Sequence, residues 1–464
     1  MDRRVGEVSG IRIISAAAAF LALSWLSGCG QSTETRLRAT LATQSTGRIL
    51  LPQGRVEITG ELRLGPGAHD LEIVGSDTTF KVAAQFQGRA VLVVEGGSNI
   101  RFRDFSIDGG RDEIARPLEM VPPENALRVW YANNGILADR VEGLEIAAVH
   151  LAQVAGFPIL VSRSSRIRIH DVTVEDSGST NARRRNNLSG GILIEEGSKD
   201  FEVRNSNFRR ILGNGLWTHS LRTSPRLENG VFAGNRFDTI GRDALQVGHA
   251  TRIKVENNSG EKIGFPLEAV DAENGGTPVA IDTAGNVDQS EYSRNSFEEV
   301  NGKCIDLDGF HHGAVRGNRC TNRLSAEDYP HGHFGMVMNN TDPGAHSQNI
   351  ELRGNVIDGA RFGGLFLMGS GHQVTGNRFV RLNLAGCGQS VPGCIYKADE
   401  PRMLESGIYL GRGVARLERT QDNVIRSNEI SGHGMRSRCI AAGPGVALAA
   451  NTVSANTCRD DPRR

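Results

Sequence analysis

The sequence predicts an all-β solenoid, in which short strands stack coil upon coil, and three observations support this fold class. Glycine makes up 57 of 464 residues, about 12% against an average of roughly 7%, so the chain contains many tight turns. A unit of the form apolar-x-x-Asn-x-apolar recurs through the C-terminal half. A short strand of alternating apolar residues, usually preceded by glycine, comes before each unit.

Composition excludes several classes of protein. Lys+Arg and Asp+Glu balance at 53 each, whereas a dedicated nucleic-acid binder carries a basic excess, so no nucleic-acid partner is expected. The hydrophobic fraction of 38% is enough for a core and too high for a disordered chain. It is also spread too evenly for several membrane spans.

The first 28 residues are predicted to be a signal peptide. Three arginines lead into an apolar run over residues 13–25, which is too short to span a bilayer comfortably, and these are Arg3, Arg4 and Arg12. The run ends in Leu26-Ser-Gly-Cys29, which resembles the lipobox of bacterial lipoproteins. The resemblance implies that Cys29 is lipidated and anchors an exported protein in the cell envelope. Gly30 resembles the outer-membrane sorting pattern, which implies a protein facing the periplasm or the cell surface. Residues 29–46 are expected to be a tether.

The recurring asparagines give the length of one coil. The shortest separations between them are 22 and 23 residues, and longer separations indicate insertions; the asparagines are Asn235, Asn258, Asn295, Asn318, Asn355, Asn377, Asn428 and Asn451. A unit of this length holds two or three strands, which pair in parallel along the axis when units stack. Asparagine suits the corners because it tolerates the left-handed backbone conformation. We expect roughly ten coils with an asparagine ladder.

These features resemble the right-handed parallel β-helix of the pectin-lyase-like superfamily over residues 47–458, which leaves a tail at 459–464. The opening Gly47-Arg-Ile-Leu-Leu-Pro-Gln-Gly54 resembles the start of many such helices, and Phe105-Ser-Ile-Asp-Gly-Gly110 resembles an early coil. The fold hosts many chemistries, so function must come from a site. A monomer is expected.

Six cysteines remain after Cys29, and an even number in an exported protein predicts disulfides. Six cysteines allow fifteen pairings. Pairing of sequence neighbours would join Cys304 with Cys320, Cys387 with Cys394, and Cys439 with Cys458. None of these spacings is that of a zinc site.

Alternation along the strands predicts which side chains face outward. In this register Asp282 lies beside Asp306 on the next coil, about 4.8 Å away, and Asp308 follows one step along the strand. We expect this acidic cluster on an exposed face to be catalytic. The substrate-binding residues expected in the same two columns are Trp217, Phe366 and Tyr409, together with Glu195 and His219. Exposed aromatic side chains in a row commonly stack on sugar rings.

The insertions are predicted to overhang the same face. They cover about residues 259–278, 321–334 and 383–405, and long loops in a compact repeat are commonly functional. The second insertion carries His331 and His333, whose imidazoles titrate near neutral pH. Together with Lys303, they are further candidates for proton transfer.

Several functions remain open for this cluster. In a glycoside hydrolase, one carboxyl group is the acid and a second activates water. Polygalacturonases of the superfamily place three aspartates similarly. The motif order differs here, because Arg252-Ile-Lys254 precedes Asp282 and Gly432-His-Gly434 lies far downstream. The chain is therefore not assigned to that family.

In a polysaccharide lyase, Asp306 and Asp308 would bind Ca²⁺, which neutralises a uronate, while a basic residue removes the C5 proton. A uronate C5-epimerase would use nearly the same site. The non-catalytic alternative is a glycan-binding or surface-structural lipoprotein, in which the aspartates cap turns.

Overall fold

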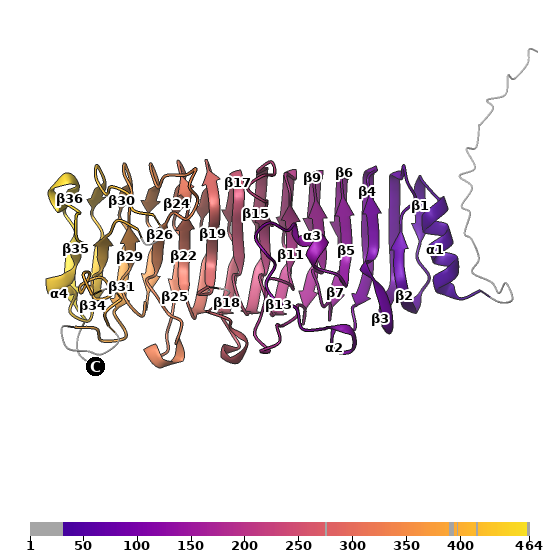
Figure 1. Ribbon diagram of the computed structural model, residues 1–464, viewed down its shortest axis with the longest axis horizontal. Coiled ribbons are helices and arrows are strands. Elements are labelled where there is room, and N and C mark those ends of the chain that lie inside the picture. Colours follow the sequence, from indigo (N-terminus) through magenta and orange to yellow (C-terminus); the bar gives the residue numbers. More distant parts are fainter. Residues whose placement is uncertain (1–30, 274–275, 389–393, 397, 414–415, 462–464) are drawn as a thin grey trace, which may run out of the picture.

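The protein is an elongated solenoid with its N-terminal and C-terminal coils at opposite ends (Figure 1). The computed structural model describes residues 31–273, 276–388, 394–396, 398–413 and 416–461. The predicted signal peptide and Cys29 therefore lie outside the described residues, as does half of the predicted tail, residues 462–464. Among the described residues, no helix has the length and apolar character needed to cross a membrane.

Three parallel sheets form the sides of the solenoid, and each coil passes through them in the order A, B, C. Sheet A contains β5 (Asn134–Asp139), β8 (Ile159–Ser162), β11 (Ile192–Glu195), β14 (Leu216–His219), the start of β17 (Leu245–Glu256), β19 (Val279–Asp288), β22 (Lys303–Asp308), β26 (Met336–Asn339), β29 (Leu365–Leu367), β32 (Ile408–Leu410) and β35 (Ile440–Ala442).

Sheet B contains β1 (Gly47–Leu50), β6 (Glu142–Ala147), β9 (Ser165–His170), β12 (Lys199–Arg204), β15 (Leu227–Ala233), the end of β17, β20 (Glu291–Ser293), β24 (Ala314–Arg316), β27 (Glu351–Arg353), β30 (Gln373–Thr375), β33 (Val424–Arg426) and β36 (Thr452–Ser454).

Sheet C contains β7 (His150–Ala152), β10 (Thr173–Glu175), β13 (Asn207–Ile211), β16 (Arg236–Ile240), β18 (Ser259–Ile263), β21 (Ser296–Val300), β25 (Arg319–Thr321), β28 (Val356–Asp358), β31 (Arg378–Leu382), β34 (Glu429–Gly432) and β37 (Thr457–Asp460). Besides β17 and β19, three long strands take part in more than one sheet, and these are β2 (Gly54–Arg63), β3 (His69–Glu95) and β4 (Ser98–Asp108). The short strand β23 (Phe310–His311) pairs with the end of β19.

The short helices lie in the connections and at the ends, and they are α1 (Thr33–Thr43), α2 (Arg111–Ile114), α3 (Leu127–Trp130), α4 (Met435–Arg438), η1 (Leu267–Ala269), η2 (Ala326–Asp328) and η3 (Leu448–Ala450).

The core is a continuous column of apolar side chains, because stacked coils place equivalent inward residues on one another. One such column in sheet A runs through Leu62, Leu92, Ile136, Ile159, Ile192, Leu216, Leu245, Ile281, Ile305, Met336, Leu365, Ile408 and Ile440. This stack is longer than the roughly ten coils predicted.

The predicted asparagine ladder is present at the corner before sheet C. The side-chain amide of Asn258, for example, donates to Asn295 Oδ1 at 2.9 Å and to the carbonyl of Phe232 at 2.9 Å. The prediction is wrong for its last member, because Asn428 bonds to Asn456. Asn451 belongs to a second ladder and receives its bond from Asn423. Asn451 and Asn456 both lie in the last coil, and the sequence repeat length favoured Asn451 over Asn456.

Part of the predicted tether is a helix that covers the N-terminal end of the solenoid. Helix α1 begins after Ser32, whose hydroxyl accepts a hydrogen bond from the backbone N–H of Thr35 at 3.1 Å. Its Leu37 and Leu41 are fully buried in the core, so residues 33–43 are not a free tether. A helix at this position shields the apolar end of the first coils with its two buried leucines.

The three disulfides join cysteines that are neighbours in the sequence, which is the pairing named above among the fifteen that are possible. They are Cys304–Cys320, Cys387–Cys394 and Cys439–Cys458. The first links β22 to β25 within a coil, and the second closes the base of the third insertion.

The insertions leave the solenoid along one edge, as Figure 1 shows for the segments around α2, after β18 and after β25. A further covering segment, residues 109–133 with α2 and α3, precedes β5 and was not predicted. These segments lie along the start of the sheet A strands and therefore determine how much of that sheet is exposed.

Candidate functional site

The predicted register of sheet A is confirmed. Trp217 pairs with Gln246 and Gln246 with Asp282, and the pairing of Ile281 with Ile305 places Asp282 beside Asp306. The outward column is otherwise apolar, and it contains Leu137, Leu160, Leu193, Trp217, Gln246, Asp282, Asp306, Val337, Phe366 and Tyr409. Three consecutive polar residues interrupt it at its centre.

The expectation of an exposed row of aromatic side chains is wrong. Trp217 is 2% exposed and packs in an apolar cluster with Leu127 and Tyr131, which come from the segment around α3. Phe366 and Tyr409 are buried as well and stack with a centroid distance of 6.0 Å. The covering segments that sequence periodicity did not place account for this burial.

The polar centre of the column is a connected set of side chains. Gln246 Nε2 donates to Asp282 Oδ2 at 2.6 Å, and Asn214 Nδ2 donates to Gln246 Oε1 at 3.1 Å. Lys303 forms an ion pair with Asp306 Oδ2. Asp306 is 7% exposed, so the acidic face is largely covered rather than open. We call Asp243, Asp282, Lys303 and Asp306 the acidic centre.

Burial determines the protonation of the acidic centre. The pKa of Asp282 is raised well above its usual value, first by loss of solvation and then by the nearby charges of Asp243 and Asp306. Burial also raises the pKa of Asp243 to about 6. The pKa of Lys303 is raised because the attraction of Asp306 and the other two carboxylates outweighs its burial. Burial therefore favours the protonated form of Asp282, next to the ion pair of Lys303 and Asp306.

Of the two predicted histidines, only His333 reaches this centre. Burial, and next the charge of Lys303, lower the pKa of His333 to about 3, so its imidazole is neutral at physiological pH. The charged neighbours of His331 are Arg185 and Arg361, which together with burial lower its pKa. Its backbone N–H donates to Asn301.

Three buried polar atoms around the centre have no hydrogen-bond partner among the described residues, and they are Asp306 Oδ1, His333 Nδ1 and Asn339 Oδ1. Buried polar atoms are rarely left without a partner. A hydroxyl-bearing ligand or ordered water at this position would satisfy them.

Asp308 has a structural contact. Its carboxylate accepts from the backbone N–H of Thr341 at 2.7 Å and from the Thr341 hydroxyl at 2.5 Å, which fixes the loop after β26. Across the part of the chain that the structure describes, Asp306 and Asp308 are not grouped with a third metal-ligating side chain. The donor set thus gives no support to the expected Ca²⁺ site.

Glu195 and His219 lie farther along sheet A, beneath α3. Glu195 is fully buried, and it accepts the backbone N–H groups of Leu127 and Arg128 at 3.0 and 3.1 Å. Burial raises the pKa of Glu195 to about 7 and lowers that of His219 to about 4. This segment covers both residues, so direct contact with a polysaccharide requires its movement.

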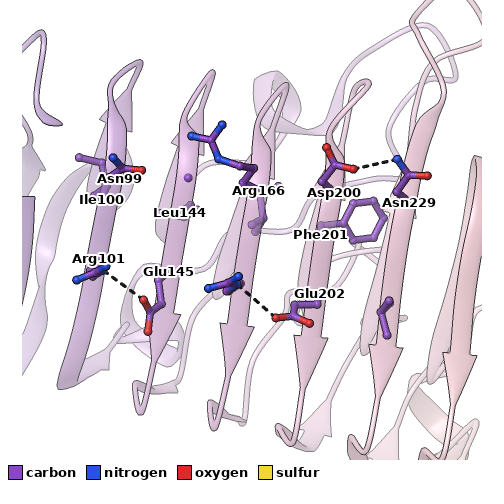
Figure 2. A pocket seen from close by; sticks show the side chains of 14 residues that line it. Asn99, Ile100, Arg101, Leu144, Glu145, Arg166, Asp200, Phe201, Glu202 and Asn229 are labelled. Carbon is purple, nitrogen blue, oxygen red and sulfur yellow. Dashed lines mark hydrogen bonds and ion pairs between the residues drawn. The ribbon is translucent and has the colours of Figure 1, made fainter. Parts of the chain in front are cut away.

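Sheet B carries an open groove of about 500 Å³. Figure 2 shows that its charged side chains are paired between coils, for example Arg101 with Glu145 at 3.3 Å and Asn229 with Asp200 at 2.9 Å. Arg168 and Glu202 approach to 3.6 Å. Alternating charges on neighbouring strands stabilise such a face.

Asp243 and Gln246 are parts of the site that the prediction did not assign a role. Asp243 begins the strand segment that contains Gln246, and its backbone N–H donates to Asn214 Oδ1 at 3.3 Å. The sequence carried little signal for Asp243, because the equivalent position holds residues as different as Asn214, Val279 and Lys303 in other coils. A charged residue at a position that starts a buried strand needs a partner or a function.

Comparison with known proteins bears on the fold. The family described as "Right handed beta helix region" matches residues 90–280. The tailspike protein of Dettilon is similar in structure, with a TM-score of 0.50 and 13% identity, over 90% of this chain and 66% of the tailspike. The chain is a right-handed parallel β-helix.

Two other solved β-helix structures are similar at lower scores. DFA-IIIase from Arthrobacter chlorophenolicus A6 has a TM-score of 0.49 and 13% identity, over 91% of this β-helix and 92% of that chain. The ORF18 protein of Geobacillus virus E2 has a TM-score of 0.47 and 12% identity, and the match spans 68% of this chain and 59% of that protein. No curated protein matches the sequence. At these identities the similarity concerns the fold alone.

Proposed function

We propose that this β-helix is an exported carbohydrate-active enzyme that acts on an acidic glycan at the acidic centre. The observation that carries the proposal is the polar interruption of an otherwise apolar column, where Asp282, whose pKa is raised by burial, lies beside the Lys303–Asp306 ion pair. Pairs of carboxyl groups whose environments favour different protonation states are the usual means of acid–base catalysis near neutral pH.

Hydrolysis fits this arrangement best. Asp282 would donate its proton to the leaving glycosidic oxygen as the general acid. The ionised Asp306 would take a proton from the water that attacks the anomeric carbon and would support the positive charge that develops on the sugar. Lys303 orients Asp306 through the ion pair and would attract a negatively charged glycan. The unpartnered Asp306 Oδ1 is available to the substrate or to water.

Elimination or C5 epimerisation is a second candidate, and neutral His333 favours it. An imidazole whose pKa is about 3 is unprotonated at neutral pH but is a weak base, so it would accept the C5 proton of a uronate only in a complex that raises this pKa. Protonated Asp282 and Lys303 would then stabilise the carboxylate of the substrate. A lyase and an epimerase differ in whether the leaving group departs.

A test is incubation of the mature protein with a panel of acidic polysaccharides. Hydrolysis yields reducing ends, a lyase yields an unsaturated product that absorbs ultraviolet light, and an epimerase changes sugar composition without shortening the chain. We expect Asp282→Asn and Asp306→Asn each to lower kcat about 10²–10⁴-fold. The matched control is Asp422→Asn at an exposed turn of another coil, which should retain full activity. Full activity in both site variants would refute the assignment.

Glycan binding without catalysis is a further candidate, and the sheet B groove favours it. Its alternating guanidinium and carboxylate groups offer donors and acceptors at the spacing of the coils. If the groove binds glycan, Arg168→Ala weakens glycan binding while Asp282→Asn leaves it unchanged.

We also propose that Cys29 carries the lipid that holds the protein at the envelope. Mass spectrometry of the membrane fraction tests this proposal.

A further inference from the structure

Glu195, Glu196 and His219 meet beneath the segment that contains α3. One ligand atom from each lies within 4.8 Å of the others. Glu195 is the last residue of β11 and Glu196 follows it, while His219 ends β14 in the next coil, where it pairs with Glu195. The cluster is separate from the acidic centre and takes no part in the chemistry proposed above.

A fourth polar group points to a ligand at this place. Ser162 is fully buried, and its Oγ has no hydrogen-bond partner among the described residues. Ser162 is the direct partner of Glu195 on β8, so the two side chains project to the same side of sheet A. His219 Nδ1 is likewise buried and unpartnered. A lone pair on each of these atoms is left without a donor.

The two carboxylates are held in place by neighbouring loops. Glu195 accepts one backbone N–H on each oxygen, from Leu127 and Arg128. Glu196 accepts the backbone N–H of Leu221 at 2.9 Å and the hydroxyl of Ser224. Each oxygen keeps a second lone pair. Loop donors that orient a ligating carboxylate from behind are typical of metal sites.

The protein balances the charge of the cluster only in part, because Arg128 pairs with Glu195 and the charge of Arg163 acts on both glutamates. Arg128 Nε approaches Glu195 only to 4.0 Å, and Glu196 has no ion pair among the described residues. Two adjacent buried carboxylates repel each other and lose solvation. A divalent cation between them would remove both penalties.

We propose that Glu195, Glu196 and His219, with Ser162 beside them, bind a divalent transition-metal cation. Two ligands of one such ion, each about 2.0–2.2 Å from it, lie no more than about 4.4 Å apart, so small side-chain adjustments close the observed arrangement. Carboxylate with imidazole favours Zn²⁺ or a similar ion over Ca²⁺, which takes oxygen ligands. The ion would join the α3 segment and the 219–226 loop to sheet A, and its role is structural.

The proposal is tested with the oxidised mature protein after treatment with a chelator. Titration calorimetry with Zn²⁺ is expected to give one site per chain, and Zn²⁺ should raise Tm. His219→Ala removes a ligand whose Nδ1 makes no hydrogen bond, so the fold should persist, as circular dichroism will verify. We expect this variant to bind Zn²⁺ at least about tenfold more weakly and to lose the rise in Tm.

The matched control is His170→Ala, which removes a surface histidine that also lies between two carboxylates, those of Glu145 and Asp171. It should bind Zn²⁺ as the wild type does. If His219→Ala fails to fold, His219→Gln replaces it. Absence of Zn²⁺ binding to the wild type, or equal affinity in the wild type and the His219 variant, would overturn the proposal. Hydrolysis or elimination at the acidic centre is assayed separately, so failure of one proposal leaves the other intact.

Discussion

At the scale of single residues, Lys303 determines how charge is distributed in the acidic centre. It forms an ion pair with Asp306, and its positive charge also attracts the carboxyl groups of Asp282 and Asp243. Three carboxyl groups share one ammonium group and are largely buried, so at least one of them keeps its proton. The sequence predicted that Asp282, Lys303 and Asp306 belong together. It did not reveal that Asp243 is a fourth member.

Asp243 should make the stability of the fold depend on pH. Its pKa is raised from 3.8 to about 6, mainly by burial, so the folded state holds this proton more tightly than the unfolded chain does. The stabilisation is complete below about pH 4 and is lost as the pH rises through 6. Asp243→Asn should therefore gain on the order of 1–3 kcal/mol relative to wild type between pH 4 and 8. Urea unfolding at both pH values measures this difference, and an unchanged difference would contradict the burial argument.

Removing Lys303 should destabilise the protein, because the buried carboxylate of Asp306 then has no counter-ion. Lys303→Met leaves Asp306 without its cation, and we expect a loss of about 3 kcal/mol in the free energy of unfolding at pH 7. The double variant Lys303→Met/Asp306→Asn should recover most of that loss, because no unpaired charge remains. Chemical denaturation of both variants tests the pair, and additive losses in the double variant would show that the two residues are not coupled.

At the scale of the elements, the asparagine ladder fixes the stacking of successive coils. Each ladder amide bonds to the next asparagine and to a backbone carbonyl, as Asn295 does with Asn318 at 2.8 Å and Val255 at 2.9 Å. These buried bonds connect strands that are far apart in sequence. They are also the reason why asparagine recurs at the coil length, which made the repeat visible in the sequence.

Asn295→Ala should destabilise the protein strongly. The change removes the amide and leaves both the Asn258 donor and the Val255 carbonyl without a partner, and each unsatisfied buried group costs about 1–3 kcal/mol. We therefore expect a loss of about 3 kcal/mol. Asn207→Ala, at an exposed position of β13, is the control and should cost less than about 0.5 kcal/mol. Equal Tm values for the two variants would exclude a stabilising ladder.

At the scale of the whole molecule, the solenoid needs protection at its ends, because the outermost coils have no neighbour on one side. Helix α1 supplies this at the N-terminal end, where Leu37 and Leu41 enter the core. The helix was not predicted, because its eleven residues have little amphipathic character outside these two leucines.

Disrupting this cap should expose apolar surface and unpaired strand edges. Leu37→Asp places a charge in the core, and we expect it to lower the free energy of unfolding by about 3–5 kcal/mol and to promote association through the first coil. Size-exclusion chromatography and thermal unfolding measure both effects. Ala39→Asp, on the exposed side of the same helix, should remain monomeric with a much smaller change. Association of both variants alike would mean that the helix does not act as a cap.

The sequence by itself determined the solenoid, its sheet A register and the adjacency of Asp282 and Asp306, because these depend on local alternation and on a repeat whose length is written in the chain. Tertiary structure decided what covers sheet A. The covering segments have no periodicity, and the contacts of the segment around α3 with Trp217 and Glu195 join residues distant in sequence. Burial by these segments turned the expected open aromatic row into packed core, and burial also raised the pKa of Asp282, which makes that residue the candidate acid.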